Sequence, residues 1–371
     1  MKLFNSRLAV AALESPVEFD AASNFTQYAQ PQTIATLIGS SDYHSISDDS
    51  LKDEDNAGWV MQLEDSVRQE WVERIRWIRL VDRLAEQELI CPAKAEFQQF
   101  LGNWQMLLHT GTIDGQSPYA WMLQAIRDRW FDAQGQPLHQ QPIHAWNQYL
   151  SALDRYNATT LEVYTCECYE QMLTDLAGAF FQVLPFLPER YGTAACHFGV
   201  VDQFYNHLRD LQEDAVSGIC YFPNELLDWF GVRREEILQQ TAPQNSNYRK
   251  MMQFWLNEYL PRLRWKVRHL RTASDVPLSW KVLGDWSMYR YRRIEQVFRE
   301  CEFDYTLFPQ IYWQRVREEL PVMLDQVKTL QAQLQAQNAS GVEYAHLRGW
   351  KKLTVLSSYV TQLQSLSASA I

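Results

Sequence analysis

Apolar residues recur at the three- and four-residue spacings of amphipathic helices over most of the chain from Leu63 onward. Short segments that contain Pro or Gly separate these stretches: CPAKAE, DGQSPYAW, DAQGQPLHQQP and LPERYG. Strict alternation of apolar and polar residues, which would indicate strands, is scarce, and Gly and Pro number only 14 each. The pattern therefore predicts an all-α protein in which helices pack on one another.

Composition and charge exclude several classes of protein. The hydrophobic fraction of 46% is ample for a core, and a charged fraction of 21% is ordinary for a globular chain, so disorder is not expected. The formal net charge is −11. Because a nucleic-acid partner needs positive charge on the protein, this balance argues against nucleic-acid binding.

Six cysteines are spread along the chain, and the close pair Cys166 and Cys168 has neither zinc-ribbon nor CxxC spacing. We therefore expect a reduced, cytoplasmic protein. The apolar run near the N-terminus is followed at once by Glu14 and Glu18, so no cleaved signal is expected. No stretch approaches the roughly 18 uninterrupted apolar residues of a spanning helix. Any membrane contact is expected to be peripheral.

The chain is expected to divide into three segments. Residues 1–60 end in the polar run SSDYHSISDDSLKDEDNAG, which predicts an N-terminal extension that is partly loop. Residues 61–330 are expected to form a single large helical domain. Residues 331–371 are expected to form a C-terminal helix and a Ser-rich tail. LDQVKTLQAQLQAQN, at residues 324–338, is typical of a surface helix or a coiled-coil piece.

The first candidate site lies in LEDSVRQEWVERIRWIRLVDRLAEQELI. Its predicted buried stripe is formed by apolar residues at helical spacing: Val67, Trp71, Ile75 and Ile78. The same line continues to Asp82 and Glu86, one turn apart. Two carboxylates on an apolar face need a partner, which is either a bound cation or a neighbouring base such as Arg79. A buried salt-bridge cluster and a metal site are equally compatible with this helix alone.

The second candidate site lies on a helix predicted over residues 198–216, whose apolar stripe is Val201, Phe204, Leu208, Leu211 and Ala215. Asn206, Asp210 and Asp214 follow one another at four-residue spacing, and Gln203 lies on the same line as the two carboxylates. Converging carboxylate and amide oxygens suit Mg²⁺, which takes its other ligands from water and phosphate. A solvated acidic helix face is the simpler explanation for one such motif, and the presence of a second acidic pair weakens it.

These residues carry a resemblance to the squalene and phytoene synthases, the head-to-head isoprenoid synthases. NHLRDLQEDAVSGICYFP is similar to their second aspartate-rich motif, N-x-x-R-D-x-x-E-D followed by a Gly and a Y-[LF]-P turn, and Gln203 also matches. IRLVDRLAEQ resembles the first motif, with Arg79, then Asp82, then Glu86 in place of the last Asp. DLAGAFFQVLPFLP resembles the V-A-G-x-x-G helix between the motifs. The resemblance extends from Leu63 to about Phe303.

The resemblance implies an all-α isoprenoid synthase fold, a single large helical domain in which two acidic helices face each other across a central cavity. It implies a Mg²⁺-dependent transferase that condenses two prenyl diphosphates head-to-head, the route to triterpenoids and carotenoids. The implied metal ligands are Asp82, Glu86, Asn206, Asp210 and Asp214. The implied phosphate clamps are Arg79 and Arg209, and the implied substrate contacts are Gln203, Tyr221 and Tyr169. Ser217-Gly218 would end the helix so that Tyr-Phe-Pro closes over the cavity.

The chain departs from the family pattern at positions that handle substrate. The Ser-x-Ser-Phe segment that helps to bind diphosphate should fall near residues 55–61, where it is absent. Met172 stands where the family has a tyrosine, although Tyr169 lies one turn away and is a candidate substitute. Phe181 replaces the second glycine of the V-A-G-x-x-G helix, and Ile219 replaces an arginine.

These departures leave two hypotheses of different classes. The chain is either an active prenyltransferase with altered substrate or product length, or a catalytically inactive relative that binds a protein partner, since the family includes an assembly factor of mitochondrial respiratory complex I. The retained acidic and arginine residues favour the enzyme. A terpene cyclase is less favoured, because the R-D-x-x-E-D motif followed by Tyr-Phe-Pro is not typical of that class.

Other classes lack their motifs. The sequence contains no HExxH, no G-x-S-x-G, no G-x-x-x-x-G-K-[ST] and no G-x-G-x-x-G, so zinc protease, hydrolase, P-loop and dinucleotide-binding functions are not indicated. The histidines, His207 among them, show no metal-ligand spacing and are interpreted as surface or core groups. The basic run RLRWKVRHLR at residues 262–271 is interpreted as a solvated helix face, with an acidic partner or membrane headgroups as the alternative.

Overall fold

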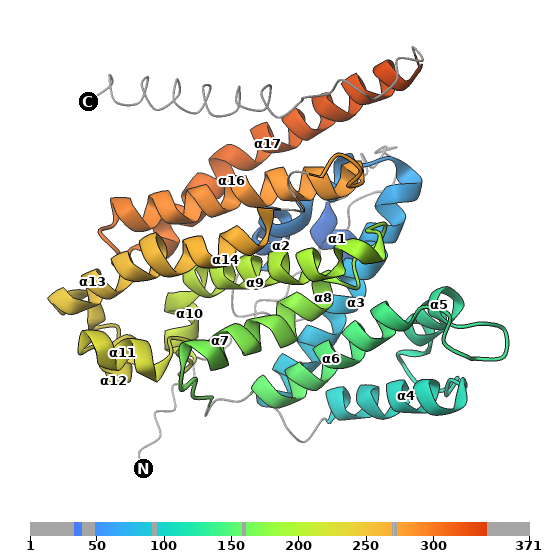
Figure 1. The fold of residues 1–371 in the computed structure, drawn as a ribbon, viewed down its shortest axis with the longest axis horizontal. Coiled ribbons are helices and arrows are strands. Elements are labelled where there is room, and N and C mark those ends of the chain that lie inside the picture. Colours follow the sequence, from blue (N-terminus) through green and yellow to red (C-terminus); the bar gives the residue numbers. More distant parts are fainter. Residues whose placement is uncertain are drawn as a thin grey trace, which may run out of the picture. The chain divides into compact units, whose positions relative to one another are not determined.

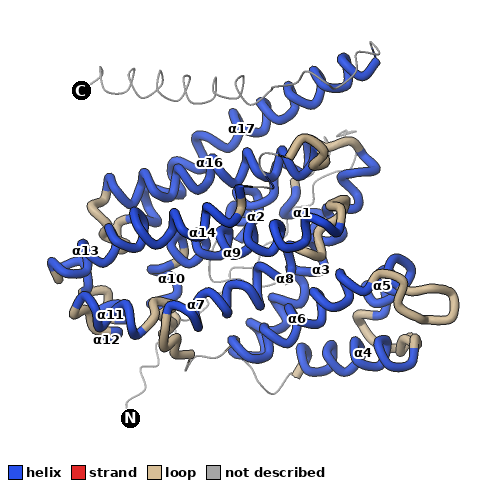
Figure 2. The backbone as a smooth tube through the Cα atoms, viewed as in Figure 1, coloured by secondary structure: helices blue, strands red, loops and turns tan. Residues whose placement is uncertain are grey.

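The computed structural model of the chain describes residues 33–38, 49–90, 95–157, 161–268, 270 and 273–339. Within them, regular secondary structure is helical apart from one isolated bridge between Phe131 and Pro137 (Figure 2). The prediction of an all-α protein is confirmed. No helix in this part of the chain is long and apolar enough to cross a membrane.

The elements follow one another from α1 to α17 (Figure 1). Up to Phe181 they are α1 (Ile34–Ile38), α2 (Asp49–Ala57), η1 (Gly58–Gln62), α3 (Asp65–Ile90), α4 (Glu96–Thr110), α5 (Ala120–Trp130), α6 (Gln140–Tyr156), α7 (Cys166–Leu173), the π-helix η3 (Thr174–Gly178) and α8 (Ala179–Phe181). The remaining ones are η4 (Glu189–Tyr191), α9 (Gly192–Arg209), α10 (Leu211–Val216), α11 (Asn224–Phe230), α12 (Arg234–Leu238), η5 (Ala242–Gln244), α13 (Ser246–Phe254), the π-helix η6 (Trp255–Tyr259), α14 (Leu260–Lys266), α16 (Leu278–Glu300) and α17 (Phe308–Ala339).

The long helix α3 packs into two separate hydrophobic clusters. Trp71 belongs to a large cluster with residues of α9, α14, α16 and α17, whereas Trp77 and Val81 belong to a second cluster with residues of α4, α5 and α6. The predicted stripe is divided between them, because Ile75 packs against the first cluster and Ile78 against the second. A helix that packs on two sides has no single buried face. For this reason Asp82, which continues the predicted stripe, is only partly buried.

Helix α9 is surrounded by other helices, and α7, η3, α8, α14 and α16 all pack against it (Figure 1). Gly199 permits the closest of these approaches. A Cβ atom at this position would lie 2.2 Å from the carbonyl oxygen of Ala177 in η3, which is far below any van der Waals contact. The glycine therefore allows the backbones of α9 and η3 to meet directly.

Helix α2 forms within the acidic run that the sequence indicated as extension or loop. Its Asp55 is fully buried and accepts hydrogen bonds from Arg293 of α16 at 2.6 Å and from the Tyr312 hydroxyl of α17 at 2.6 Å. The polar composition of this segment therefore reflects buried ion pairs with distant helices and not a solvated loop. The proposed boundary at residue 60 falls inside η1, and the division into three segments stays a prediction.

Helix α17 contains the predicted surface-helix segment at residues 324–338 and continues through an internal Pro321. In Figure 1, α16 and α17 run side by side. The predicted C-terminal helix and Ser-rich tail lie outside the described residues, apart from the end of α17.

Candidate active site

The second acidic motif spans the end of α9 and all of α10, with Asp210 at the junction between them. The predicted apolar stripe is confirmed, since each of its members is buried: Val201, Phe204, Leu208, Leu211 and Ala215. The helix ends as expected, because Gly218 adopts a φ of 79°. The Ile219 amide then donates to the Asp214 carbonyl at 2.8 Å and the Gly218 amide to the Ala215 carbonyl at 3.1 Å. This is the Schellman arrangement, which turns the chain toward Tyr221.

The first acidic motif lies on α3, where Arg79 connects it to α2. The Arg79 guanidinium lies 3.3 Å from Asp53 and 3.6 Å from Asp82. Protein packed around the carboxyl, together with Glu86, raises the pKa of Asp82 to about 7, even though 37% of this side chain is exposed. Glu86 is more exposed and pairs with Arg83 at 3.1 Å. Arg79 thus only partly offsets the negative charge of Asp82 and Glu86.

Helix α2 links the two motifs, because its Lys52 pairs with Asp210 and its Asp53 pairs with Arg79, which also contacts Asp82. Burial raises the pKa of Tyr221 well above its ordinary value, and the carboxylates of Asp214, Asp82, Glu86 and Asp210 raise it further. Charges of both motifs therefore act on the same buried hydroxyl. The structure therefore brings the acidic residues of α3 and α10 together, although they are far apart in the sequence.

Asp210 is neutralised by bases of the protein itself. The Arg209 guanidinium donates to both of its carboxylate oxygens, at 2.7 and 2.8 Å, and Lys52 of α2 lies 3.5 Å from one of them. Arg209 also donates to the side-chain oxygen of Asn56 at 2.8 Å. Burial alone would raise the pKa of Asp210, but Arg209 and Lys52 hold it far below its usual range.

Asn206 lies one turn before Asp210, and its amide group is already bonded. Its side-chain oxygen accepts a hydrogen bond from Arg290 of α16 at 2.9 Å, and its amide nitrogen donates to Asp202 at 3.2 Å. Arg290 is only 2% exposed and also contacts Asp202 at 3.4 Å. A metal at Asn206 would have to compete with this buried guanidinium.

His207 joins the three residues expected to contact substrate. The Tyr169 hydroxyl lies 3.1 Å from its Nδ1 atom, Gln203 lies 3.0 Å from its Nε2 atom, and the Tyr221 ring stacks on the imidazole at 3.9 Å. Burial lowers the pKa of His207 to about 3, so the ring is neutral and donates through one nitrogen while it accepts through the other. The sequence indicated only a surface or core role for His207, and the four-residue spacing between Gln203 and His207 is the signal that could have placed it here.

The acidic site fits a divalent cation only if further ligands complete it. Among the described residues, no group of three or more His, Cys, Asp or Glu side chains could hold a metal ion. The Asp214 carboxylate, however, has no hydrogen bond or ion pair within this part of the structure, and burial and Asp210 raise its pKa well above the usual value. Since Mg²⁺ commonly uses one or two protein carboxylates and takes its other oxygens from phosphate, these acidic residues would suit a magnesium ion that a diphosphate also binds.

Residues 53–315, which are well over half of the chain, match the family described as squalene/phytoene synthase. The chain belongs to the squalene/phytoene synthase family. A crystal structure of a dehydrosqualene synthase in complex with ligand is similar at a TM-score of 0.54 and 15% identity, and the match covers 78% of this chain and 96% of that one. At this identity the likeness shows the isoprenoid synthase fold, which confirms the predicted fold class. No curated protein matches the sequence.

This member of the squalene/phytoene synthase family has bulky side chains in its interior. Phe181, which replaces a family glycine, is only 4% exposed, and its ring centroid lies 5.2 Å from that of Phe198 and 6.4 Å from that of Trp280. Met172 is buried as well. Tyr169 lies on α7 one turn before Met172, and its hydroxyl forms a hydrogen bond with His207.

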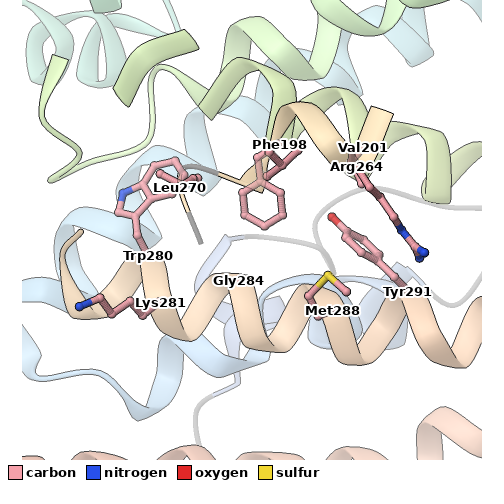
Figure 3. A pocket seen from close by; sticks show the side chains of 10 residues that line it. Phe198, Val201, Arg264, Leu270, Trp280, Lys281, Gly284, Met288 and Tyr291 are labelled. Carbon is pink, nitrogen blue, oxygen red and sulfur yellow. The ribbon is translucent and has the colours of Figure 1, made fainter. Parts of the chain in front are cut away.

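A cavity of about 40 Å³ lies beside α9, α14 and α16 (Figure 3). Phe198 and Val201 of α9, Arg264 of α14 and Trp280 and Tyr291 of α16 are among the residues that line it. No residue of either acidic motif lines it, and its volume suits only a few water molecules. It is therefore distinct from the acidic site and too small for a prenyl chain.

Proposed function

We propose that the chain is a Mg²⁺-dependent prenyltransferase that condenses two prenyl diphosphates head-to-head, as squalene and phytoene synthases do. The observation that carries the proposal is that α2 brings the two acidic motifs together, since Lys52 pairs with Asp210 and Asp53 pairs with Arg79 beside Asp82. The Asp214 carboxylate has no hydrogen bond or ion pair among the described residues. Carboxylates gathered in this way are costly unless a cation binds them. A metal-bound diphosphate is the ligand that matches their charge and chemistry.

The proposed roles extend those implied by the sequence. Asp82, Glu86 and Asp214 would hold Mg²⁺, and Asn206 and Asp210 complete the proposed ligand set. When bound, Mg²⁺ supplies positive charge that makes diphosphate a better leaving group. Arg79 and Arg209 would bind phosphate oxygens through their forked guanidinium groups.

The remaining site residues would bind and shield the prenyl chain. Tyr169, Gln203 and Tyr221 are held by His207, so their polar groups have fixed positions at the edge of the acidic site. The Tyr169 ring also belongs to an aromatic cluster with Phe204 and Trp255, in which the ring centroids lie 5.2 to 6.3 Å apart. Such rings exclude water and present negative faces to an allylic cation.

We place this enzyme in the cytoplasm, with membrane contact limited to the surface. The cysteines of the described residues are all free, in keeping with a reducing compartment. Prenyl diphosphates combine a charged head with a lipid tail, so a chain that acts on them is expected to meet membranes at their surface.

Purified protein incubated with farnesyl or geranylgeranyl diphosphate tests the proposal, with diphosphate release and product mass followed with and without Mg²⁺. We expect a Mg²⁺-dependent product of two prenyl units, which is lost in Asp82→Ala and Asp214→Ala. Asp128→Ala, an exposed carboxylate on α5, is the matched control and should retain activity. A product of one prenyl unit would instead indicate a terpene cyclase.

A second candidate function rests on Phe181. Its buried ring occupies a position where the family has no side chain, which favours an inactive relative that binds a protein partner. If the well-folded protein neither releases diphosphate nor binds it, the result supports this alternative and contradicts the proposed enzyme.

A further inference from the structure

The outward side of α14 combines an exposed tryptophan with basic side chains. Trp265 is 68% exposed, and the guanidinium of Arg268, just beyond the end of the helix, lies over its ring at 3.7 Å. Arg262 and Lys266 are exposed on the same short segment. Residues 260–268 contain no Asp or Glu. These four residues, Arg262, Trp265, Lys266 and Arg268, are called the α14 face below.

The inward side of α14 is anchored in the core next to the candidate active site. Leu260, Leu263 and Val267 are buried, and α14 packs on α9, the helix that carries Gln203 (Figure 1). The apolar side of this amphipathic helix is therefore already covered by the protein. Trp265 lies on the other side, where its large ring contributes little to the core.

Neighbouring acids neutralise the α14 face only in part. Lys266 pairs with Glu170 at 2.8 Å, and Glu258 is exposed one turn before Arg262. Arg262 itself has no hydrogen bond or ion pair within the described residues, and its guanidinium lies over the Tyr259 ring at 5.6 Å. Arginine charge thus remains available beside the exposed indole.

Resting on the surface contact with membranes proposed above, we infer that the α14 face docks the chain on an anionic phospholipid surface. Tryptophan prefers the boundary between headgroups and acyl chains, because its ring is apolar and its N–H group is polar. Arginine and lysine are attracted to anionic headgroups. Arg268, stacked on Trp265, would carry its charge to the headgroups beside the inserted indole.

An acidic protein surface is the other partner that this charge would suit. The bases alone would satisfy such a partner, whereas an exposed indole beside them also suits the apolar layer under lipid headgroups. The substrate and product of the proposed reaction carry long apolar chains as well. Both observations favour the membrane.

Vesicle binding by the full chain tests the inference without turnover. The chain is sedimented with phosphatidylcholine vesicles that contain or lack phosphatidylserine. We expect binding only where phosphatidylserine is present, and weaker binding as salt rises, because salt screens exposed charges. Trp265→Ala and Arg262→Gln should each weaken binding roughly fivefold or more, whereas Arg262→Lys should retain it.

Two matched substitutions outside the α14 face serve as controls. Trp229, at 64% exposure, is as accessible as the tryptophan under test, but its helix α11 carries Glu225 and Asp228 and no base. Arg155 of α6 is an exposed arginine over a tyrosine, Tyr156, at 5.7 Å. Trp229→Ala and Arg155→Gln should bind vesicles as the wild type does.

Fluorescence gives a second readout that keeps the fold intact. Phosphatidylserine vesicles with brominated acyl chains should quench part of the wild-type tryptophan fluorescence, and Trp265→Phe should lose that quenching. The inference is overturned if the wild type does not bind phosphatidylserine vesicles, or if Trp265→Ala and Arg262→Gln bind them as well as the two controls do. Binding to polyglutamate but not to vesicles would also overturn it, in favour of an acidic protein partner.

The inference and the proposed function fail in different ways. A chain that forms a two-unit prenyl product but does not bind anionic vesicles would retain the enzyme and lose the docking face. A chain that binds vesicles through the α14 face but forms no product would retain the face and lose the enzyme.

Discussion

The Arg293 guanidinium donates to the Asp55 carboxylate at 2.6 Å, and both side chains are buried. This pair connects α16 with α2, the helix that brings Lys52 and Asp53 to the acidic site. Burial alone would raise the pKa of Asp55, but Arg293, Arg290 and the Tyr312 hydroxyl hold it below its usual value. The ion pair therefore stabilises the fold and also positions part of the candidate active site.

We predict that Asp55→Asn lowers the free energy of unfolding by about 3 kcal/mol or more, because it leaves buried guanidinium charge uncompensated. Urea unfolding followed by circular dichroism measures this. Asp65→Asn, whose side chain is 84% exposed, is the control and should change stability by less than about 0.5 kcal/mol. Equal effects of the two substitutions would contradict the importance of the buried pair.

The same pair predicts a dependence on pH. The pKa of Asp55 is lower in the folded chain than its ordinary 3.8, so the folded state binds fewer protons at this group than the unfolded state. The contribution of Asp55 is therefore fully present above about pH 4 and is lost as the pH falls through the folded-state pKa. The stability difference between wild type and Asp55→Asn should be constant from pH 7 to 5 and shrink below about pH 4. A difference that widens on acidification would be evidence against this.

Tyr169→Phe should reduce prenyl turnover at least roughly tenfold and stability by about 1 kcal/mol, because the hydroxyl that bonds to His207 is removed. Tyr248→Phe is the matched control. The Tyr248 hydroxyl is buried without a hydrogen-bond partner in the described part of the chain, so its removal should be neutral or stabilising. Turnover and urea unfolding are measured for both variants. If Tyr169→Phe and Tyr248→Phe have equal turnover, Tyr169 has no role in the reaction.

Much of the second motif was predictable because its determinants are local. The stripe from Val201 to Ala215 follows the helical period, and Gly218 ends the helix by a conformation that glycine adopts readily. The roles of Asp55 and Arg290 were not predictable in this way. Asp55 pairs with a residue 238 positions away and Arg290 with one 84 positions away, so their burial depends on the folded arrangement of α2, α9 and α16.

Helix α2 is a second case in which contacts between distant residues decide the structure, because its own sequence suggests a loop. DSLKDEDNA is typical of a loop by composition, since most of its residues are charged or polar. It is helical here because Asp53 and Asp55 find arginines on α3 and α16. Lys52 could therefore not be assigned to the acidic site until those contacts were known.

Gly199→Ala should destabilise the protein by about 1–3 kcal/mol, since the added Cβ would lie 2.2 Å from the Ala177 carbonyl oxygen and the two backbones would have to separate. Gly102→Ala on α4 meets nothing within 4 Å and should stabilise by about 0.5–1 kcal/mol. Thermal unfolding of both variants checks this pair. A stabilising Gly199→Ala would show that α9 and η3 are not in direct backbone contact.

Phe181→Ala should cost about 3–5 kcal/mol of stability and allow a longer prenyl diphosphate to react, because it opens space beside Trp280. Phe298→Ala removes an equally buried ring that stacks on Phe308 at 4.3 Å and serves as the control. It should cost similar stability and leave substrate length unchanged. Relative turnover of farnesyl and geranylgeranyl diphosphate separates the two, and the same preference in both variants would contradict a role for Phe181 in chain length.

The π-helix η3 has a consequence for how such sites diverge. A π turn contains one more residue than an α turn, and one residue rotates the following side chains by about 100°. Tyr169 on α7 and Ala177 in η3 both contact α9. The extra residue of the π turn lies between α7 and the helix that follows, so the side chains before and after it point in directions that differ from those of a continuous α-helix. Insertion or deletion of a single residue here would change which side chain of α7 reaches His207. The side chain presented to the candidate site can therefore be exchanged by a shift of register, with no substitution at the tyrosine itself.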